Sequence, residues 1–204
     1  MIHLPRLYAI LDASAFPNID ALCLNAQELV LAGVTLIQYR NKNGNTREML
    51  ENARELKRCI GDSAKLILND RADLCIAAGF DGVHVGQDDL SPSGARKVIG
   101  NDIWLGVSTH NPDQVVEANK TSADYIAIGP VFGTSSKEKP DPVVGLDGVR
   151  QARALTHKPL VAIGGITRAT CLSVIEAGAD SIAVISDLVK DSRKSAEEFF
   201  RILR

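Results

Sequence analysis

The regular alternation of short aliphatic runs with amphipathic stretches constrains the fold of this chain more than any other feature. The strand candidates are Leu7–Leu11, Leu36–Tyr39, Lys65–Leu68, Gly82–Val85, Trp104–Val107, Tyr125–Ile128, Leu160–Ile163 and Ser181–Ile185. A helix-like segment follows each run, and examples are Ile19–Ala32, Thr46–Cys59, Ala169–Ala177 and Ser195–Leu203. Uninterrupted aliphatic strands that alternate with helices indicate a parallel sheet covered by helices.

The junctions between helix-like segments and strands repeat one pattern. In LAGVTLIQYR, AAGFDGVHVG, TSADYIAIGP and EAGADSIAVIS, a small residue ends a helix and a strand follows within a few residues. Glycine suits a left-handed helix cap, and the short link suits a turn from helix to strand. Eight such units predict a single (β/α)8 TIM barrel, with an open doubly wound sheet as the alternative, since periodicity does not prove closure. No linker or change of composition divides residues 1–204, so we expect one domain.

Composition and charge narrow the classes of function. Of the 204 residues, 45% are hydrophobic and only 4% aromatic, so small and branched aliphatic side chains must build the core. The formal net charge of −2 gives no general attraction for nucleic acid or an anionic membrane, which leaves small molecules as the expected partners. No apolar run approaches membrane-spanning length, and scattered cysteines suit reduced thiols, so we expect a cytoplasmic enzyme. The sequence leaves the oligomeric state open, a homo-oligomer included.

Polar residues gather where the predicted strands end. In a barrel of this kind the carboxyl ends of the strands face the active site, and the opposite face serves stability. A random scatter of surface polar residues would not be confined to one end of every strand. The polar strand ends are Gln38–Lys42, Asn69–Asp70, His84–Asp89, Ser108–His110, Gly129–Lys137, Gly164–Thr167 and Ile185–Asp187.

Two aspartates at adjacent strand ends, Asp70 and Asp89, could share one hard cation. Mg²⁺ prefers oxygen ligands and is usually held by one or two carboxylates, water and substrate phosphate. Either aspartate alone would be read as a solvated loop residue or a helix cap. Arg40, Lys42 and Lys137 are expected at the same opening, and three cations beside two carboxylates suit a metal-bound polyanion.

A second anion site is predicted after the seventh and eighth strands, where this fold often binds phosphate. Backbone N–H groups of the Gly164–Gly165 turn and the Ile185–Ser186 strand end could hold a phosphate without a basic side chain. His84 and His110 are lone histidines near strand ends, for which a structural role is expected before a role in proton transfer. The sequence has no nucleophile elbow, P-loop, dinucleotide fingerprint or zinc spacing.

Seven motifs in order, QYRNK, LND, VHVGQDD, GVSTH, GPVFGTSSK, VAIGGIT and AVIS, resemble those of the thiamine-phosphate synthase family. The resemblance covers nearly the whole chain. It implies an enzyme that joins 4-amino-2-methyl-5-hydroxymethylpyrimidine diphosphate to a thiazole phosphate, carboxylated or not, and releases diphosphate. The expected reaction begins with Mg²⁺-dependent dissociation of diphosphate, after which the thiazole nitrogen captures the pyrimidine cation.

The resemblance also implies roles for residues. The pyrimidine diphosphate would contact Gln38, Tyr39, Arg40, Asn41, Lys42, Asn69, Ser108 and Lys137. The thiazole phosphate would contact Thr134, Ser135, Ser136, Gly165, Ile185 and Ser186. Asp70 and Asp89 would bind one Mg²⁺ per subunit, and catalysis would rest on Arg40, Lys42, Ser108 and Lys137. Two departures stand out, because Asn41 replaces a common Glu and Gly133 replaces a common Pro.

Three other functions remain open at this point. A thiazole tautomerase on the same barrel would use His110 for proton transfer, but it would not need Asn69, Asp70, Asp89 and Lys137. A non-catalytic phosphate-ligand binding protein would have no reason to keep metal ligands. A phosphate-binding barrel isomerase of amino-acid biosynthesis finds no support in the motifs of strands two and four.

Overall fold

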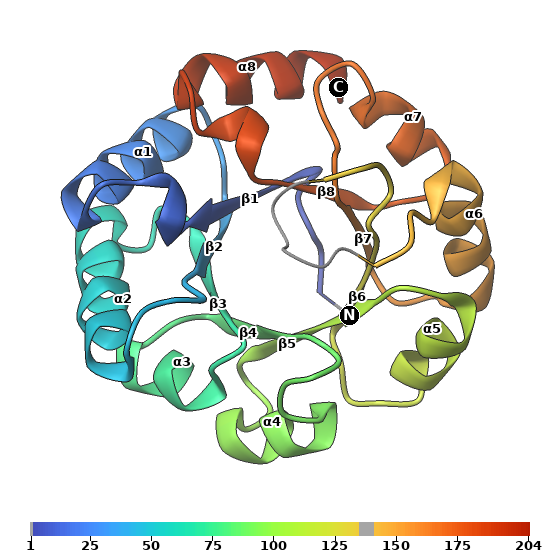
Figure 1. The fold of residues 1–204 in the computed structure, drawn as a ribbon, viewed down its shortest axis with the longest axis horizontal. Helices are drawn as coiled ribbons and strands as arrows, with labels where there is room; N and C mark the ends of the chain where they lie inside the picture. The colour runs from blue at the N-terminus through green and yellow to red at the C-terminus, as the bar shows by residue number, and fades with distance from the viewer. Residues whose placement is uncertain (1, 135–140) are drawn as a thin grey trace.

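The eight strands form a closed parallel barrel. A computed structural model of the chain describes residues 2–134 and 141–204. The strands pair in chain order from β1 to β8, and β8 closes against β1 with Leu7 opposite Ile182. Helices surround the strands on the outside (Figure 1). The predicted (β/α)8 barrel is confirmed, and the open sheet is excluded.

The element bounds agree with the expected strands to within two residues. The strands are β1 (Leu7–Asp12), β2 (Leu36–Arg40), β3 (Lys65–Asn69), β4 (Gly82–Val85), β5 (Trp104–Thr109), β6 (Tyr125–Ile128), β7 (Leu160–Ile163) and β8 (Ser181–Val184). The helices are α1 (Ile19–Leu31), α2 (Thr46–Ile60), α3 (Ala72–Ala78), α4 (Pro92–Ile99), α5 (Pro112–Asn119), α6 (Gly145–Leu155), α7 (Cys171–Glu176) and α8 (Ser192–Ile202). Two short 3₁₀ helices, η1 (Ala13–Ala15) and η2 (Ser186–Leu188), follow β1 and β8.

Side chains alternate between the two faces of the barrel wall, and each face has its own apolar cluster. The larger cluster lies between the strands and the helices and includes Leu66, Val83 and Ile126. The smaller one fills the barrel interior with Tyr8, Ile10, Leu36, Ile67, Tyr125, Ala127, Val161 and Ala183. Because successive strand residues point to opposite faces, every second residue at a strand end points into the barrel mouth.

Local sequence fixes the starts of several helices. Four helices begin with a side-chain cap, in which a side-chain oxygen accepts the backbone N–H three residues later. The bond satisfies a donor that the helix leaves free. The capping residues are Asn18, Asn45, Ser91 and Asn111. Proline at the first helical position of α4 and α5 is preset for that turn. These caps fix the residues at which α1, α2, α4 and α5 begin.

At the amino-terminal face of the barrel, three aspartates tie neighbouring strands together. Asp81, Asp124 and Asp180 each precede a strand, and each carboxylate accepts a backbone N–H at the start of the preceding strand, at 2.7–2.9 Å. In return each aspartate donates its own N–H to the same residue's carbonyl at 2.8 Å. These aspartates recur in three of the repeated junctions noted in the sequence, and their role there is structural.

In the described part of the chain, no helix combines the length and apolarity needed to cross a bilayer. All four cysteines are free thiols, and three of them are buried.

Candidate active site

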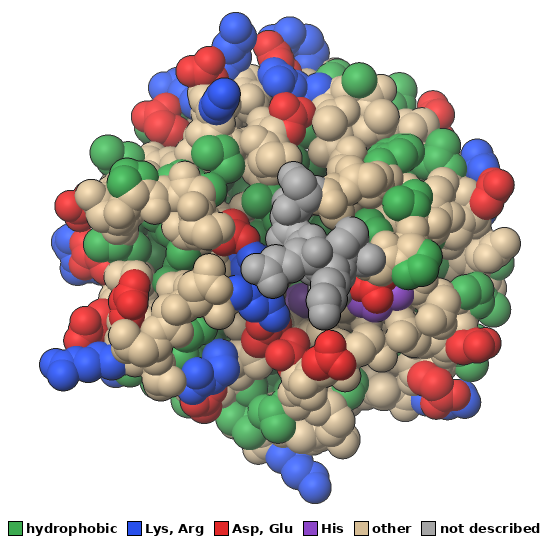
Figure 2. All heavy atoms as spheres, in the orientation of Figure 1, with side chains coloured by type: hydrophobic (Ala, Val, Ile, Leu, Met, Phe, Trp, Pro, Cys, Tyr) green, Lys and Arg blue, Asp and Glu red, His purple; other side chains and the backbone are tan. Residues whose placement is uncertain are grey.

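The carboxyl ends of the strands surround a cavity of about 390 Å³. Basic and acidic side chains lie beside one another near the centre of this face (Figure 2). The structure brings together at the cavity most of the residues singled out in the sequence: Gln38, Arg40, Lys42, Asn69, Asp70, Asp89, Ser108, Thr134, Gly165, Ile185 and Ser186. Ser135, Ser136 and Lys137 lie outside the described residues.

Two residues of the strand-two motif lie away from the cavity. Tyr39 is buried in the outer cluster, between the strands and the helices. Asn41 donates to the Tyr39 hydroxyl at 3.2 Å, and its Oδ1 accepts the backbone N–H groups of Asn43 and Gly44. The strand period explains this arrangement, because Gln38 and Arg40 point inward and Tyr39 must point outward. The structure therefore places Tyr39 and Asn41 as supports of the loop after β2.

Asp70 occupies an unusual backbone position beside a second carboxylate. Its φ of 66° lies in the left-handed region, which costs energy for a residue other than glycine and often marks a functional site. Burial, together with the neighbouring Asp89 carboxyl, raises the pKa of Asp70 to about 6. Lys42 Nζ lies 2.5 Å from Asp70 Oδ2 and opposes that rise. Two acidic groups held this close favour a shared proton or a shared cation.

The residues present fit a magnesium ion. Asp89 Oδ2 accepts the backbone N–H of Gly86 at 2.8 Å, which closes the loop after β4 and holds the carboxylate beside Asp70. Among the described residues no group of three or more His, Cys, Asp or Glu side chains could hold a metal. The chain would thus offer two carboxylates, with water and a phosphate-bearing ligand as the other sources of oxygen, which is the usual way proteins hold Mg²⁺.

Arg40 is held in place by Asp12 at the end of β1. The two residues are register partners on neighbouring strands, and the Arg40 guanidinium forms an ion pair with Asp12 Oδ2. Asp12 is 6% exposed, and its Oδ1 accepts from the backbone N–H and the hydroxyl of Ser14. Sequence reasoning missed Asp12, although it is a polar residue directly after an aliphatic strand, the signal that was used at the other strand ends.

Asn69 brings a further donor to the cavity. Its buried Nδ2 has no hydrogen-bond partner among the described residues, and the residue lines the cavity. An unmet buried donor costs free energy, so such a group in a binding cavity favours a ligand that accepts a hydrogen bond. Asn69 is therefore suited to a phosphate oxygen or another acceptor.

The second predicted anion site follows β7 and β8. Gly164 and Gly165 have φ values of 100° and 64°, and a Cβ on Gly165 would lie 2.5 Å from the carbonyl oxygen of Gly133. Close packing against the loop after β6 is therefore a sufficient reason for glycine at both positions, whether or not a ligand binds there. Among the described residues, no protein atom accepts the N–H of Gly165, and Gly165 lines the cavity. That N–H is available to an anion.

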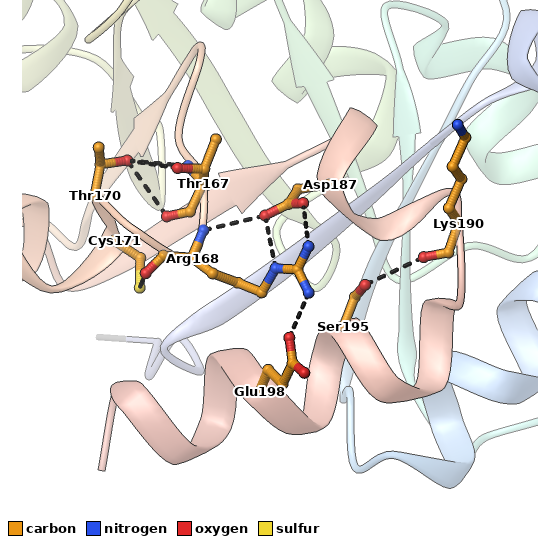
Figure 3. A network of polar contacts seen from close by, with 8 residues as sticks. All are labelled: Thr167, Arg168, Thr170, Cys171, Asp187, Lys190, Ser195 and Glu198. Carbon is orange, nitrogen blue, oxygen red and sulfur yellow. Dashed lines mark hydrogen bonds and ion pairs between the residues drawn. The ribbon is translucent and has the colours of Figure 1, made fainter.

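An arginine clamp joins the loops that carry this site. The Arg168 guanidinium donates to both carboxylate oxygens of Asp187, at 2.9 and 3.2 Å, and also contacts Glu198 of α8 (Figure 3). The backbone N–H of Arg168 donates to Asp187 as well, at 3.1 Å. Bidentate arginine–carboxylate pairs fix geometry as well as supply energy. The clamp therefore sets the position of the Gly164–Gly165 turn relative to Ser186.

The floor of the cavity is a chain of hydrogen bonds across the barrel interior. It runs from Gln38 to the hydroxyls of Tyr8 and Tyr125, then to His84 and Ser108, over distances of 2.7–3.2 Å. Burial lowers the pKa of His84 to about 4, so the ring is neutral at physiological pH. Burial also raises the pKa values of Tyr8 and Tyr125. The floor is thus uncharged while the rim carries the charges.

His110 is oriented by two partners at the cavity wall. Its Nδ1 lies 2.6 Å from the carbonyl oxygen of Gly129, which can only accept, so Nδ1 carries a proton. Its Nε2 lies 3.5 Å from Asp141 Oδ2. The structure gives His84 and His110 positioned partners that the sequence alone did not reveal.

The comparison with protein families identifies the chain. Residues 7–188 match the family model described as thiamine monophosphate synthase. The chain belongs to the thiamine monophosphate synthase family. A thiamine-phosphate synthase of Koribacter versatilis (strain Ellin345) is 62% identical over 205 residues, with 99% of this chain and 97% of the relative covered. One from Agrobacterium fabrum (strain C58) is 41% identical over 203 residues, covering 96% and 92%.

Solved structures agree with membership of the thiamine monophosphate synthase family. A thiamine phosphate pyrophosphorylase from Pyrococcus furiosus superposes with a TM-score of 0.86 at 34% identity, over 97% of this chain and 95% of that chain. A 3-hexulose-6-phosphate synthase superposes with a TM-score of 0.75 at 19% identity, covering 98% and 100%, and so shares the fold alone. The chain is an enzyme of thiamine biosynthesis, a transferase of the EC 2.5.1.3 type that acts on small molecules.

Proposed function

We propose that the enzyme condenses 4-amino-2-methyl-5-hydroxymethylpyrimidine diphosphate with a thiazole phosphate, giving thiamine phosphate and diphosphate, in a Mg²⁺-dependent reaction. The main support is that one cavity is lined by two unlike groups of residues, each suited to an anion. One combines the Asp70 and Asp89 carboxylates with Arg40 and Lys42, and the other offers backbone N–H groups near Gly165. A diphosphate with its metal suits the first, and a single phosphate suits the second.

Asp70 and Asp89 would hold the Mg²⁺, and Asn69 would donate to the diphosphate through its buried amide. When bound, Mg²⁺ supplies positive charge against the diphosphate oxygens. Lys42 offers a mobile cation, since its side chain is 49% exposed and is held only at Asp70 among the described residues. Lys137 is proposed as a third cation of this set.

Arg40 would bind a terminal phosphate oxygen while Asp12 fixes the guanidinium. A cation held in advance at the place where negative charge develops stabilises the departing diphosphate without reorganisation. The residues below this rim are uncharged, so the cationic pyrimidine would meet the neutral Tyr8, Tyr125 and His84. Ser108, whose Oγ lies 2.8 Å from His84 Nε2, would bind the pyrimidine ring.

The thiazole phosphate would be held by Gly165 and Ser186, whose loop positions the Arg168 clamp sets. Its other proposed contacts are Thr134, Ser135, Ser136 and Ile185. Anchoring its phosphate places the thiazole nitrogen opposite the pyrimidine methylene, and such positioning can be worth about 7–11 kcal/mol in favourable cases. The reaction needs no protein nucleophile, and no cysteine of the described chain lines the cavity.

The test is release of diphosphate with each substrate alone and with both, in Mg²⁺ and in EDTA. We expect release that requires both substrates and the metal. Metal-independent release would contradict the roles of Asp70 and Asp89. Conversion of one thiazole phosphate isomer into another without the pyrimidine substrate would instead favour a tautomerase with His110 as the proton-transfer group.

A further inference from the structure

We infer that Tyr8, Tyr125 and His84 are positioning residues that fix which atoms donate and which accept hydrogen bonds in the pyrimidine subsite. They would turn Gln38 Oε1 toward the ligand as an acceptor and the Ser108 hydroxyl toward it as a donor. This inference deepens the proposed function, because it rests on an aminopyrimidine as the substrate at the cavity floor.

The direction of the hydrogen bonds along this chain, from donor to acceptor, is set first at Gln38. Its Nε2 donates to the Tyr8 hydroxyl at 2.7 Å, and an amide nitrogen cannot accept. The Tyr8 hydroxyl proton must therefore point elsewhere, and the Tyr125 hydroxyl oxygen, at 3.2 Å, is its partner. Because Nε2 is engaged with Tyr8, Oε1 remains on the side of the cavity, which Gln38 lines.

The same logic carries the polarity through the histidine. Tyr125 accepts from Tyr8, so its own proton goes to His84 Nδ1, 3.1 Å away. A neutral ring that accepts at Nδ1 carries its proton on Nε2, and Nε2 lies 2.8 Å from Ser108 Oγ. Ser108 accepts that proton, which leaves its own hydroxyl proton to point into the cavity it lines.

Packing leaves these groups little freedom to turn. A Cβ on Gly106 would lie 2.1 Å from Tyr125 Cζ and 2.4 Å from His84 Nδ1, so this strand residue must be glycine for the two rings to meet. The Tyr8 and Tyr125 rings meet edge to face at 78°, and both are at most 1% exposed. Fully connected buried networks are rigid and specify one arrangement.

An aminopyrimidine matches this arrangement. Its exocyclic amino group donates, which suits Gln38 Oε1, and its ring nitrogens accept, which suits the Ser108 hydroxyl. A pyrimidine with a 4-oxo group in place of the amino group presents an acceptor and a ring N–H, the opposite of both requirements. A site that hydrogen-bonds a polar group discriminates strongly against a ligand with the wrong group there, because its own buried atoms lose their partners.

The polarity can be tested without catalysis by long-range ¹H–¹⁵N NMR of the histidine rings in the uniformly labelled full chain. The His84 signals are assigned by their loss in His84→Gln. We expect a neutral ring with its proton on Nε2. A ring protonated on Nδ1 would overturn the inference, because Ser108 would then donate to His84 and offer only a lone pair to the ligand. This result does not depend on whether the proposed reaction occurs.

Tyr125→Phe tests the consequence for substrate choice, since it breaks the chain in its middle and nearly conserves volume. We expect KM for the pyrimidine diphosphate to rise about tenfold, with KM for the thiazole phosphate unchanged as an internal control. The preference for the amino over the 4-oxo pyrimidine diphosphate should fall by a similar factor. Thermal unfolding checks that the variant is folded. A folded variant that keeps the full preference for the amino pyrimidine would show that the network does not set which atoms donate and accept in the subsite. His84→Gln should lose the same preference.

Discussion

Aspartates flank the strands at both ends of the barrel, yet the two ends use them differently. At the amino-terminal end Asp81, Asp124 and Asp180 precede strands and bond to the backbone of the neighbouring strand. At the carboxyl end Asp12 is the last residue of β1, and Asp70 and Asp89 follow β3 and β4 and line the cavity. Asp12 and Asp70 pair with Arg40 and Lys42, and Asp89 lies beside Asp70. The same residue type therefore joins strands at one end, whereas at the other end it lies among the charged residues beside the cavity.

The difference lies in what satisfies each carboxylate. Asp124 Oδ2 accepts from Leu105 N–H and from Arg96, both at 2.7 Å, so the protein supplies a backbone donor and a cation to this carboxylate. Asp70 has Lys42 on one side and the like charge of Asp89 on the other, and its raised pKa shows that the protein disfavours its charged form. Carboxylates at the amino-terminal end stabilise the fold, whereas we propose that the Asp70–Asp89 pair is completed by a bound cation.

The largest effect is expected from Asp70→Asn, which keeps the shape of the side chain and removes the charge. Turnover in saturating Mg²⁺ should fall by about 10²–10³-fold, because stabilisation of the leaving diphosphate is lost. Steady-state release of diphosphate measures this, with the exposed Asp102→Asn as the matched control. Activity within twofold of wild type would contradict the proposed functional role of the aspartates at the carboxyl end of the barrel.

Asp124→Ala should give the converse result. Loss of the carboxylate leaves the Leu105 N–H without its acceptor and removes the ion-pair partner of Arg96, which keeps only its bonds to backbone carbonyls. We expect a loss of about 2 kcal/mol of unfolding free energy. Turnover by the folded enzyme should stay near that of wild type. Urea unfolding followed by circular dichroism measures the first quantity, and a variant as stable as wild type would contradict the structural role.

Asp70→Asn should also stabilise the metal-free protein at neutral pH. The folded-state pKa of about 6 lies above the ordinary value of 3.8, so the folded protein binds the Asp70 proton more tightly than the unfolded chain does. The charged carboxylate therefore lowers stability above pH 6 by at most about 3 kcal/mol, and by less after solvent screening because the side chain is 18% exposed; it has no such effect below about pH 4. Unfolding in EDTA at pH 8 and pH 4 should show the advantage of Asn only at pH 8. An equal difference at both pH values would contradict this explanation.

Asp12→Asn should have an intermediate effect on binding. Without the charge-assisted pair, Arg40 is no longer fixed, and KM for the pyrimidine diphosphate should rise about tenfold. KM for the thiazole phosphate should not change, because the Asp12 carboxylate contacts Arg40 and Ser14 and no residue assigned to that phosphate. A change confined to the thiazole phosphate would show that Asp12 acts elsewhere.

The smallest effect is expected from Arg168→Gln, which removes the clamp beside the second anion site. KM for the thiazole phosphate should rise about fivefold, the equivalent of one hydrogen bond. Arg193→Gln, at an exposed ion pair within α8, is the matched control. An equal rise in KM for both substrates would show a general loosening of the loops in place of a local one.

The sequence was sufficient for most of the fold because the strands are uninterrupted aliphatic runs. Their bounds were predicted closely, and the chief errors lie at the helix ends, where α8 begins at Ser192 instead of Ser195. Closure could not be read from periodicity, because it depends on the pairing of β1 with β8 across nearly the whole chain. The strand-joining role of Asp81, Asp124 and Asp180 could not be read either, because it depends on which backbone N–H of the neighbouring strand each carboxylate reaches.

The site was predictable where position along a strand decides exposure. Asp70, Asp89 and Arg40 follow from polar strand ends, and strict alternation would also have placed Tyr39 outside. The contacts of His84 could not be read, because its partners Tyr125 and Ser108 lie 41 and 24 residues away. The pairing of Arg40 with Asp12 depends on cross-strand register, which sequence patterns do not supply.

The most direct test of the central claim is calorimetric binding of inorganic diphosphate to the wild-type enzyme and to Asp70→Asn, each with Mg²⁺ and with EDTA. We predict that Mg²⁺ strengthens diphosphate binding by the wild-type enzyme at least about tenfold and that this enhancement disappears in the variant. Equal binding in Mg²⁺ and in EDTA, or an enhancement that survives in Asp70→Asn, would contradict the assignment of the Asp70–Asp89 pair as the magnesium–diphosphate site.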